Sequence, residues 1–310
     1  MNKIIFGIDL GGTQIKFGKF DLNNLLDKFA IDTDISDEGT HIIPDICSTI
    51  KEHLKPSEEL IGVSIGVPGP VLKGVVLGAQ NINWLEVDVI KEINKFFPNI
   101  IVNVLNDANA ALLGEVGFGS AKGYSNAILL TLGTGLGGGI LIDGKVYEGA
   151  NGSSGEVGHI CLEKNGRECT CGLKGCLEQY VSATGIVKTA MELKSGKISC
   201  LNDHPFTAKD VFDYAKEGDE VALEVVEKVT DDLAIGVASI CNTLNPEVVL
   251  LGGGVSKAGE ILLNKTKEKF LKYAFYSLRY KTEFKLAVLG NDAGIYGNYY
   301  SIKRRIENEN

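Results

Sequence analysis

The sequence predicts an α/β fold, in which the strands of a sheet alternate with helices. Short apolar runs such as residues 4–10 and 127–132 have the length and composition of buried strands. Residues 219–244 instead repeat apolar side chains at helical spacing. Glycine clusters directly follow several of the predicted strands, as expected where the chain must turn tightly.

The first part of the chain is expected to alternate strands with helices. Its predicted strands are residues 4–10, 15–20, 60–67 and 98–105. Its predicted helices are residues 40–54 and 106–116, the second of them rich in alanine. The glycine-rich segment 117–123 that follows suits a hinge or a domain boundary.

The second part begins with a weak copy of the opening pattern. Residues 4–20 have the order strand, glycine turn with threonine, strand, and residues 127–142 repeat it with the turn at 133–139. Further elements are expected as strands at 248–251 and 286–289 and as helices at 219–244 and 291–305. Asp219 suits the N-cap of the long helix, and the polar tail of the last helix is expected to fray.

Three predicted strand ends carry glycine clusters suited to binding phosphate groups. They are Asp9-Leu10-Gly11-Gly12-Thr13, Gly133-Thr134-Gly135 and Gly252-Gly253-Gly254. Glycine lets a ligand approach backbone N–H groups closely, and a threonine hydroxyl adds a donor. Two such hairpins facing each other could bind a polyphosphate from both sides. Asp9 is suited to orient a hydrated Mg²⁺ ion, whereas Lys16 either points to the same region or is merely solvated.

Two common glycine-rich nucleotide motifs fit these clusters less well. A Rossmann dinucleotide site needs a helix directly after its glycines, but residues 140–142 continue as a strand. A P-loop needs Gly-Lys-Ser or Gly-Lys-Thr, and neither triplet occurs. Hairpins without any ligand would account for one cluster alone, but three clusters, one of them beside Asp9, disfavour this alternative.

Asp107 stands at the start of the helix predicted after strand 98–105, directly after Asn106. An ionised carboxylate in this place can act as a general base that accepts the proton of a hydroxyl attacking phosphorus. The Asn106 side chain would hydrogen-bond a neighbouring hydroxyl. The alternative is that Asp107 only complements the positive end of the helix.

A short stretch of the second part contains one histidine and three cysteines, namely His159, Cys169, Cys171 and Cys176. This set matches tetrahedral structural zinc, and Gly172 and Gly175 favour a tight knuckle. Four protein ligands leave no position open for water, so a structural role is expected. Reduced thiols without a metal are the alternative. Disulfides are not expected, and the remaining cysteines should be buried as small hydrophobic side chains: Cys47, Cys161, Cys200 and Cys241.

The overall charge excludes some classes of function. A formal net charge of −9 disfavours broad electrostatic binding to nucleic acid or to an anionic membrane, although backbone N–H groups can still bind phosphate. The first apolar run ends at Asp9, too short for a signal peptide, and residues 127–142 fall short of a bilayer span. We therefore expect a soluble, cytoplasmic protein without a nucleic-acid or membrane partner.

Four motifs, in this order along the chain, resemble those of the ROK family of repressors, open reading frames and sugar kinases. The motifs are Asp9-Leu10-Gly11-Gly12-Thr13, Leu132-Gly133-Thr134-Gly135-Leu136-Gly137-Gly138-Gly139, Gly155-Glu156-Val157-Gly158-His159 and Cys169-x-Cys171-Gly172-x-x-Gly175-Cys176-Leu177-Glu178. The resemblance extends from Gly7 to Gly297.

The resemblance implies an actin/hexokinase-like (ribonuclease H-like) fold of two lobes, with ATP bound in the cleft between them. On this basis we place a small N-terminal lobe at residues 1–118, joined by the C-terminal helix 293–310. The large lobe, at residues 119–292, would carry the zinc-binding loop and a dimerisation surface. A homodimer is expected on the same ground.

The resemblance also implies roles for individual residues. Asp107 falls on the catalytic base of the family. The expected contacts to the sugar are Asn106, Asp107, Glu156, His159 and Glu178, and Asn81 and the Pro68-Gly69 turn resemble sugar-side positions as well. His159 would serve both zinc and sugar through its two ring nitrogens. The residues expected at ATP and Mg²⁺ are Asp9, Gly11, Gly12, Thr13, Gly133, Thr134, Gly135, Gly253 and Gly254.

Within the family, a kinase is favoured over a regulator. The repressors carry a helix-turn-helix before the phosphate hairpin, whereas here the hairpin begins at residue 4. Residues 175–185 are similar to the glucokinases of the family, so the expected reaction is ATP-dependent phosphorylation of glucose at its C6 hydroxyl. Kinases for N-acetylmannosamine, N-acetylglucosamine, allose or fructose share the motifs and are alternatives, and a sugar-sensing regulator without kinase activity is another.

Overall fold

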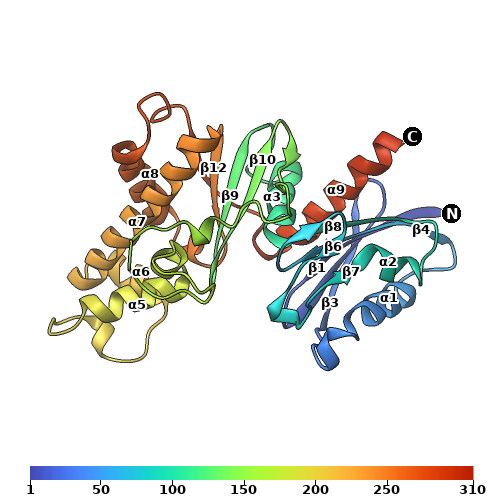
Figure 1. Cartoon of the computed structure of the whole chain (residues 1–310), viewed down its shortest axis with the longest axis horizontal. Helices are drawn as coiled ribbons and strands as arrows, with labels where there is room; N and C mark the ends of the chain where they lie inside the picture. Colours follow the sequence, from blue (N-terminus) through green and yellow to red (C-terminus); the bar gives the residue numbers. More distant parts are fainter. Residues whose placement is uncertain (310) are drawn as a thin grey trace. The chain divides into compact units, whose positions relative to one another are not determined.

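The structure of the protein is a computed structural model that describes residues 1–309. The chain forms two compact units (Figure 1). The first comprises Met1–Gly123, Val146–Ser154 and the C-terminal segment from Asn291, and the second comprises Tyr124–Lys145 and Gly155–Gly290. Each unit combines a sheet with helices, so the predicted α/β class is confirmed. Val146–Ser154 belongs to the first unit, whereas the sequence placed it in the second lobe.

The first unit is built on a five-stranded sheet of order β3-β2-β1-β4-β8. Its strands are β1 (Asn2–Leu10), β2 (Gln14–Phe20), β3 (Leu25–Asp32), β4 (Glu58–Val67) and β8 (Ile101–Asn106). The first three are antiparallel neighbours, whereas β4 and β8 run parallel to β1. The sequence predicted all of these strands except β3, which escaped prediction because it lies at the sheet edge with most of its side chains exposed.

One face of this sheet packs on α1 (Ile42–Glu52) and α2 (Val89–Asn94). Ile4, Phe6 and Ile8 of β1 are fully buried in the core that these helices share with the sheet. The alternation of β1 side chains between the two faces explains why every second residue belongs to this core. The predicted helix at 40–54 corresponds to α1 and is confirmed, although α1 begins later and ends earlier than predicted.

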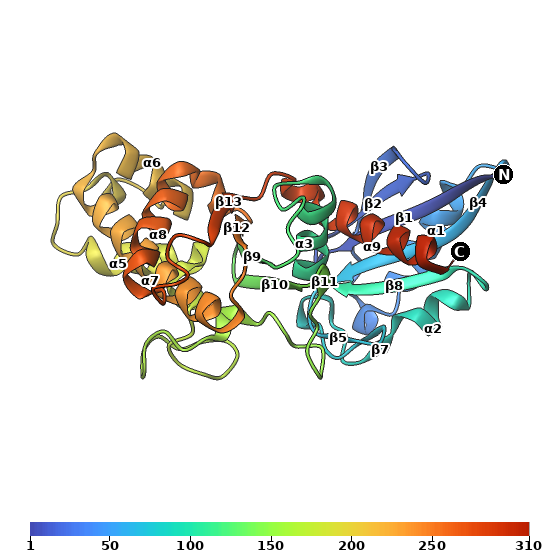
Figure 2. The same ribbon diagram turned by 90° about the horizontal axis from the view of Figure 1, so that it is seen from above.

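The other face is covered by α9 (Ala293–Glu309), which packs along α3 (Asp107–Phe118) in Figure 2. Ile5 belongs to the core on this side. A Cβ atom at Gly7 would lie 2.3 Å from the Ile295 carbonyl oxygen, so only glycine lets α9 approach β1 this closely. The predicted helices at 106–116 and 291–305 are confirmed. The polar tail that was expected to fray continues α9 as far as Glu309, and Asn310 lies outside the described residues.

A small sheet of order β5-β6-β7 completes the first unit. Its strands are β5 (Val71–Leu72), β6 (Val75–Val76) and β7 (Val87–Asp88). Short helices η1 (Asp37–Gly39) and η2 (Gln80–Ile82) lie beside it, tied together by Trp84, whose indole N–H donates to the Gly39 carbonyl at 3.0 Å.

The second unit repeats the sheet order of the first. Its order is β11-β10-β9-β12-β13, with an antiparallel hairpin, β9 to β10, followed by two parallel neighbours. The strands are β9 (Ala127–Leu132), β10 (Leu136–Ile142), β11 (Lys145–Val146), β12 (Val248–Gly252) and β13 (Glu283–Leu286). The weak sequence repeat is thus a repeat of whole sheets, and this doubled topology is that of the actin/hexokinase-like fold.

Two boundaries in the second sheet correct the sequence prediction. The turn predicted at 133–139 is only Gly133-Thr134-Gly135, because Gly137, Gly138 and Gly139 pair with β9 as part of β10. The last strand spans Glu283–Leu286, not 286–289, because its ladder with β12 runs from Val248 to Leu251.

The helices of the second unit lie together in both views (Figures 1 and 2). Their buried side chains form one apolar core. The helices are α4 (Glu178–Val181), α5 (Ala183–Leu193), α6 (Ala208–Glu217), α7 (Glu220–Leu244) and α8 (Glu260–Tyr273), with short helices η3 (Val157–His159), η4 (Cys200–Asn202) and η5 (Val255–Ala258). The predicted long helix is α7. Asp219 caps it as predicted, because its carboxylate accepts the Ala222 N–H at 2.9 Å. Within residues 1–309, no helix is both long and apolar enough to cross a membrane.

Two of the four cysteines predicted to be buried are exposed instead. Cys47 and Cys241 lie in the cores, where burial raises the pKa of each thiol to about 12. Cys161 and Cys200 are exposed because they lie in short connections at the surface, after η3 and at the start of η4. None of the seven cysteines, all of which lie within the described residues, is paired in a disulfide.

We predict that Asn298→Ala destabilises the first unit by about 1–3 kcal/mol. Asn298 is fully buried in α9; its amide donates to the Ile8 carbonyl and accepts from the Ser64 hydroxyl, both at 2.8 Å. Removing it leaves these two buried groups without their partner. The midpoint of urea unfolding measures the effect. Asn264→Ala, the same change at an exposed position of α8, is the control, and equal midpoints for the two variants would contradict the prediction.

Candidate active site and metal centre

The turn Gly11-Gly12-Thr13 joins β1 to β2 and is held from outside by Thr33. The Thr33 hydroxyl donates to the Gly11 carbonyl at 2.7 Å, and the Thr33 N–H donates to the Thr13 carbonyl at 3.0 Å. A Cβ atom at Gly12 would lie 2.8 Å from the Asn81 carbonyl oxygen, so this close approach requires glycine. The turn is therefore fixed while Thr13 stays exposed.

Asp9 and Lys16 form an ion pair across β1 and β2. The two residues are opposite each other in the strand register, and Lys16 Nζ lies 3.1 Å from Asp9 Oδ2. A Cβ atom at Gly294 would lie 2.8 Å from Asp9 Cγ, so the glycine near the start of α9 makes room for this carboxylate. Of the two alternatives for Lys16, the structure favours the one in which it faces the Asp9 region.

Asn106 and Asp107 occupy the junction where β8 ends and α3 begins. Asn106 is the N-cap: its Oδ1 accepts the Ala108 N–H at 3.0 Å, and its Nδ2 donates to the Gly69 carbonyl at 3.0 Å. Asp107 is exposed, and its Oδ1 accepts the Ala108 N–H at 2.8 Å. The first unit thus brings Asn106 to the Pro68-Gly69 turn, while an amide hydrogen of Asn106 is left for a further acceptor.

In the second unit, the turn Gly133-Thr134-Gly135 is held by the segment 178–184. The Ala183 N–H donates to the Gly133 carbonyl at 2.9 Å, and the Thr184 hydroxyl donates to the Thr134 carbonyl at 3.1 Å. Glu178 accepts the N–H of Leu136, the first residue of β10, at 2.9 Å. A side chain at Gly135 would collide with this carboxylate, because its Cβ would lie 2.5 Å from Glu178 Oε2.

A cavity of about 480 Å³ opens beside this turn. It is lined by Gly133, Thr134, Ala183, Thr207, Ala208, Lys209, Phe212, Asp213, Gly254, Val255, Lys257 and Ala258. Its size and its mixed apolar and polar wall suit a small ligand. Gly254 belongs to a predicted glycine cluster, but the wall from α6 was not predicted. The Thr207 capping box marks the start of α6 in the sequence, yet it gives no sign of a cavity.

The four predicted metal ligands come together in the second unit. The sulfurs of Cys171 and Cys176 lie 3.7 Å apart, and Cys169 Sγ lies 3.8 Å from His159 Nδ1. All four ligand atoms lie within 4.8 Å of one another. Tetrahedral zinc with Zn–S bonds of about 2.3 Å would place its ligand atoms roughly 3.7 Å apart. The donor set therefore fits a four-coordinate metal ion.

Glycines shape the loop that carries these ligands. Gly172 and Gly175 both have positive φ, at 87° and 73°. A Cβ atom at Gly175 would lie 1.7 Å from the Glu163 carbonyl oxygen, so no other residue fits. The Gly172 N–H donates to the Cys169 carbonyl at 3.0 Å and closes the knuckle.

Neighbouring groups shift the pKa values of two of the thiols. Burial raises the pKa of the Cys169 thiol, but hydrogen bonds from Cys171, Cys176 and His159 outweigh burial and lower it to about 7. Burial and the neighbouring thiols raise the pKa of Cys176 to about 12. His159 turns Nδ1 to this cluster, while its Nε2 lies 3.8 Å from Glu156 Oε2. One imidazole thus faces both the metal ligands and a predicted sugar contact.

One residue of this loop was not singled out in the sequence. The Arg167 side chain is largely buried, and its guanidinium hydrogen-bonds backbone carbonyls of α4 and α5. No local pattern marks it, because its partners follow at irregular spacing and meet it only through the folding of the loop.

Comparison with known proteins agrees with these motifs. The model of the ROK family matches residues 5–305. A glucokinase of Halalkalibacterium halodurans is 39% identical over 96% of this chain and 94% of that protein. A glucokinase of Thermotoga maritima is 38% identical over 97% of this chain and 98% of that protein.

Solved structures give the same result. A ROK family glucokinase from Streptomyces griseus, in complex with glucose and AMPPNP, is 31% identical, with a TM-score of 0.78 over 97% of this chain and 99% of that chain. A ROK family transcriptional regulator, a homologue of the E. coli MLC protein, is 26% identical, with a TM-score of 0.87 over 98% of this chain and 78% of that one. The chain belongs to the ROK family.

Proposed function

We propose that this protein transfers the γ-phosphoryl group of ATP to the C6 hydroxyl of glucose. The observation that carries the proposal is the contact of Glu178 with the second glycine turn. Glu178 is a predicted sugar contact, yet its carboxylate binds the N–H of Leu136 at the end of the predicted phosphate turn. A phosphotransferase needs its acceptor and its phosphate donor next to each other, and the contact of a proposed sugar residue with the proposed phosphate turn supports this reaction. The glucokinase relatives support the same reaction.

Asp107 is the proposed general base. It would accept the proton of the C6 hydroxyl as that oxygen attacks the γ-phosphorus in line. The exposed position of Asp107 at the start of α3 leaves its carboxylate accessible to a substrate, while the bond to the Ala108 N–H orients it. Asn106, Glu156, His159 and Glu178 are the proposed contacts to the other sugar hydroxyls.

The glycine turns are the proposed donors to the phosphates. Backbone N–H groups and the hydroxyls of Thr13 and Thr134 would stabilise the charge on the transferred group. Asp9 is suited to hold hydrated Mg²⁺, which is usually bound by one or two carboxylates plus phosphate oxygens and supplies further neutralising charge when present. The cavity beside Thr134 and Gly254 is the proposed site of the nucleoside.

Zinc is the proposed metal at His159, Cys169, Cys171 and Cys176. Its chemistry there would be structural, because four protein ligands complete a tetrahedral shell. Holding His159 by Nδ1 leaves Nε2 facing Glu156, so the loop would present both residues to the sugar.

A kinase for another hexose or an N-acetylhexosamine is an alternative within the same chemistry. A sugar-sensing regulator is the second candidate class, and the similarity to a ROK transcriptional regulator favours it. The exposed Asp107 and both fixed glycine turns favour the kinase, because sensing a sugar requires neither a base nor a phosphate site.

We predict that Asp107→Asn lowers kcat for glucose by roughly 10²–10⁴-fold, because an amide cannot accept the hydroxyl proton. Asparagine keeps the acceptor for the Ala108 N–H, so the fold should be retained, as circular dichroism can verify. Asp45→Asn makes the same change in the first turn of α1 and should leave kcat unchanged. Near-full turnover by well-folded Asp107→Asn protein would exclude this residue as the base.

A coupled assay of ADP release tests the substrate directly. Glucose, mannose, fructose, N-acetylmannosamine and N-acetylglucosamine are compared, and we expect the highest kcat/KM with glucose. A higher value with another sugar would reassign the acceptor. Absence of turnover with every sugar would favour the regulator.

Metal content tests the zinc proposal. Elemental analysis of purified protein should find about one zinc per chain. Cys171→Ser should lose the metal, lower the melting temperature and raise the KM for sugar, whereas Cys200→Ser, at another exposed cysteine, should change none of these. Metal should also be released as the pH falls, because protons compete for the thiolates. Protein without metal, with activity unaffected by a strong chelator, would rule out the site.

A further inference from the structure

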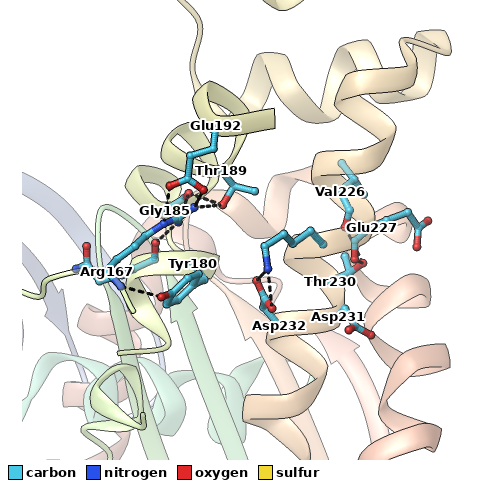
Figure 3. Close-up of polar contacts among 12 residues, drawn as sticks. Arg167, Tyr180, Gly185, Thr189, Glu192, Val226, Glu227, Thr230, Asp231 and Asp232 are labelled. Carbon is cyan, nitrogen blue, oxygen red and sulfur yellow. Dashed lines mark hydrogen bonds and ion pairs between the residues drawn. The ribbon is translucent and has the colours of Figure 1, made fainter. Parts of the chain in front are cut away.

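The Arg167 guanidinium joins the metal-binding loop, which we define as residues 159–176 with the four proposed metal ligands, to the junction of α4 and α5 (Figure 3). Nη1 donates to the carbonyl of Gln179, in α4, at 2.6 Å and to the carbonyl of Gly185, in α5, at 3.2 Å. One nitrogen thus bridges the backbones of two consecutive helices. The side chain is only 14% exposed, so these bonds are largely shielded from water.

The remaining donors of Arg167 anchor it on α5. Nη2 donates to the Thr189 hydroxyl at 2.9 Å, and Nε and Nη2 form a fork with the Glu192 carboxylate at 3.1 and 2.6 Å. The guanidinium also lies over the Tyr180 ring, 4.6 Å from its centroid, and the Tyr180 hydroxyl accepts the Arg167 backbone N–H (Figure 3). All five N–H groups of the guanidinium therefore have an acceptor, an arrangement that lysine cannot reproduce.

The junction that Arg167 holds is a tight one. A Cβ atom at Gly185 would lie 2.7 Å from the backbone of Gln179, so the two helices meet in backbone contact. Ser182 separates them and caps α5 by accepting the Gly185 N–H at 3.1 Å. A junction packed this closely leaves little room for one helix to shift against the other.

The same junction also contacts the second glycine turn. Ala183 and Thr184 bind the carbonyls of Gly133 and Thr134. Glu178, at the start of α4, accepts the Leu136 N–H just after the turn. Glu178 and Thr184 are thus direct chain neighbours of Gln179 and Gly185, whose carbonyls Arg167 binds.

We propose that Arg167 is a positioning residue for the phosphate turn Gly133-Thr134-Gly135 and so sets nucleotide affinity from within the metal-binding loop. The inference rests on the proposed function, because it assumes that this turn binds phosphate. Arg167 belongs neither to the cavity lining nor to the metal-ligand set, so its effect on nucleotide passes through residues 178–185. The metal-binding loop then serves the nucleotide as well as the sugar.

Hydrogen–deuterium exchange tests the mechanical part of the proposal without any ligand. In Arg167→Ala, peptides covering residues 133–137 should exchange roughly 2- to 30-fold faster than in the wild type. Arg279→Ala is the matched control, because this arginine of the second unit donates to one backbone carbonyl, that of Ala274. Unchanged exchange of 133–137 in folded Arg167→Ala would overturn the proposal.

Calorimetric titration with ADP tests the functional part. Arg167→Ala should raise the Kd for ADP roughly 2- to 30-fold while its zinc content stays equal to that of the wild type. The Kd of Arg167→Lys should lie between those of the wild type and Arg167→Ala. The Kd for glucose should change less than the Kd for ADP. An unchanged ADP affinity, or a loss confined to preparations that have lost zinc, would overturn the proposal.

The proposal can still be tested if Arg167→Ala does not fold or if the proposed function is wrong. If Arg167→Ala does not fold, Glu192→Gln replaces it, since this change removes the charge that anchors the guanidinium and keeps the size of the side chain. Unchanged exchange and affinity in that variant would overturn the proposal. If the wild type neither binds ADP nor phosphorylates a sugar, the proposed function fails, and the exchange rates alone then decide whether Arg167 holds the turn.

Discussion

The proposed phosphate site of the second unit depends on the contacts that hold its glycine turn, above all the hydrogen bond from the Leu136 N–H to the Glu178 carboxylate. A turn of two glycines and a threonine has little stiffness of its own, because glycine restricts the backbone least. The Glu178 carboxylate constrains the turn together with Ala183 and Thr184, and the space for the carboxylate exists only because Gly135 has no side chain. The same glycine that would admit a phosphate therefore also admits the group that fixes the turn.

The two units hold their glycine turns by different contacts. In both sheets a glycine turn joins the two strands of an antiparallel hairpin, β1 to β2 and β9 to β10. Parallel strands lie beside each hairpin. In the first unit, Thr33, which follows the neighbouring strand β3, holds the turn with its hydroxyl and its backbone N–H. In the second unit the support comes from helices α4 and α5. The two sheets thus share their topology, whereas the contacts that stabilise their glycine turns differ.

The metal-binding loop makes several of the contacts that shape the second unit. The same loop brings four donor atoms to tetrahedral spacing, turns His159 Nε2 toward Glu156 and carries Arg167 to the helix junction. Two glycines with positive φ make so short a path possible. A structural ion fits this arrangement, because a loop with so little apolar core of its own needs a crosslink to hold its side chains in place.

The sequence by itself determined the α/β class, the glycine turns, the place of Asp107 at a strand–helix junction and the candidate set of metal ligands. These depend on residue types at short spacing, so local patterns reveal them. Only the tertiary structure decided the contact of Glu178 with Leu136, the fork of Arg167 and the cavity wall from α6. Each of these joins residues that are distant or irregularly spaced in the chain, and a hydrogen bond between such residues leaves no periodic trace in the sequence.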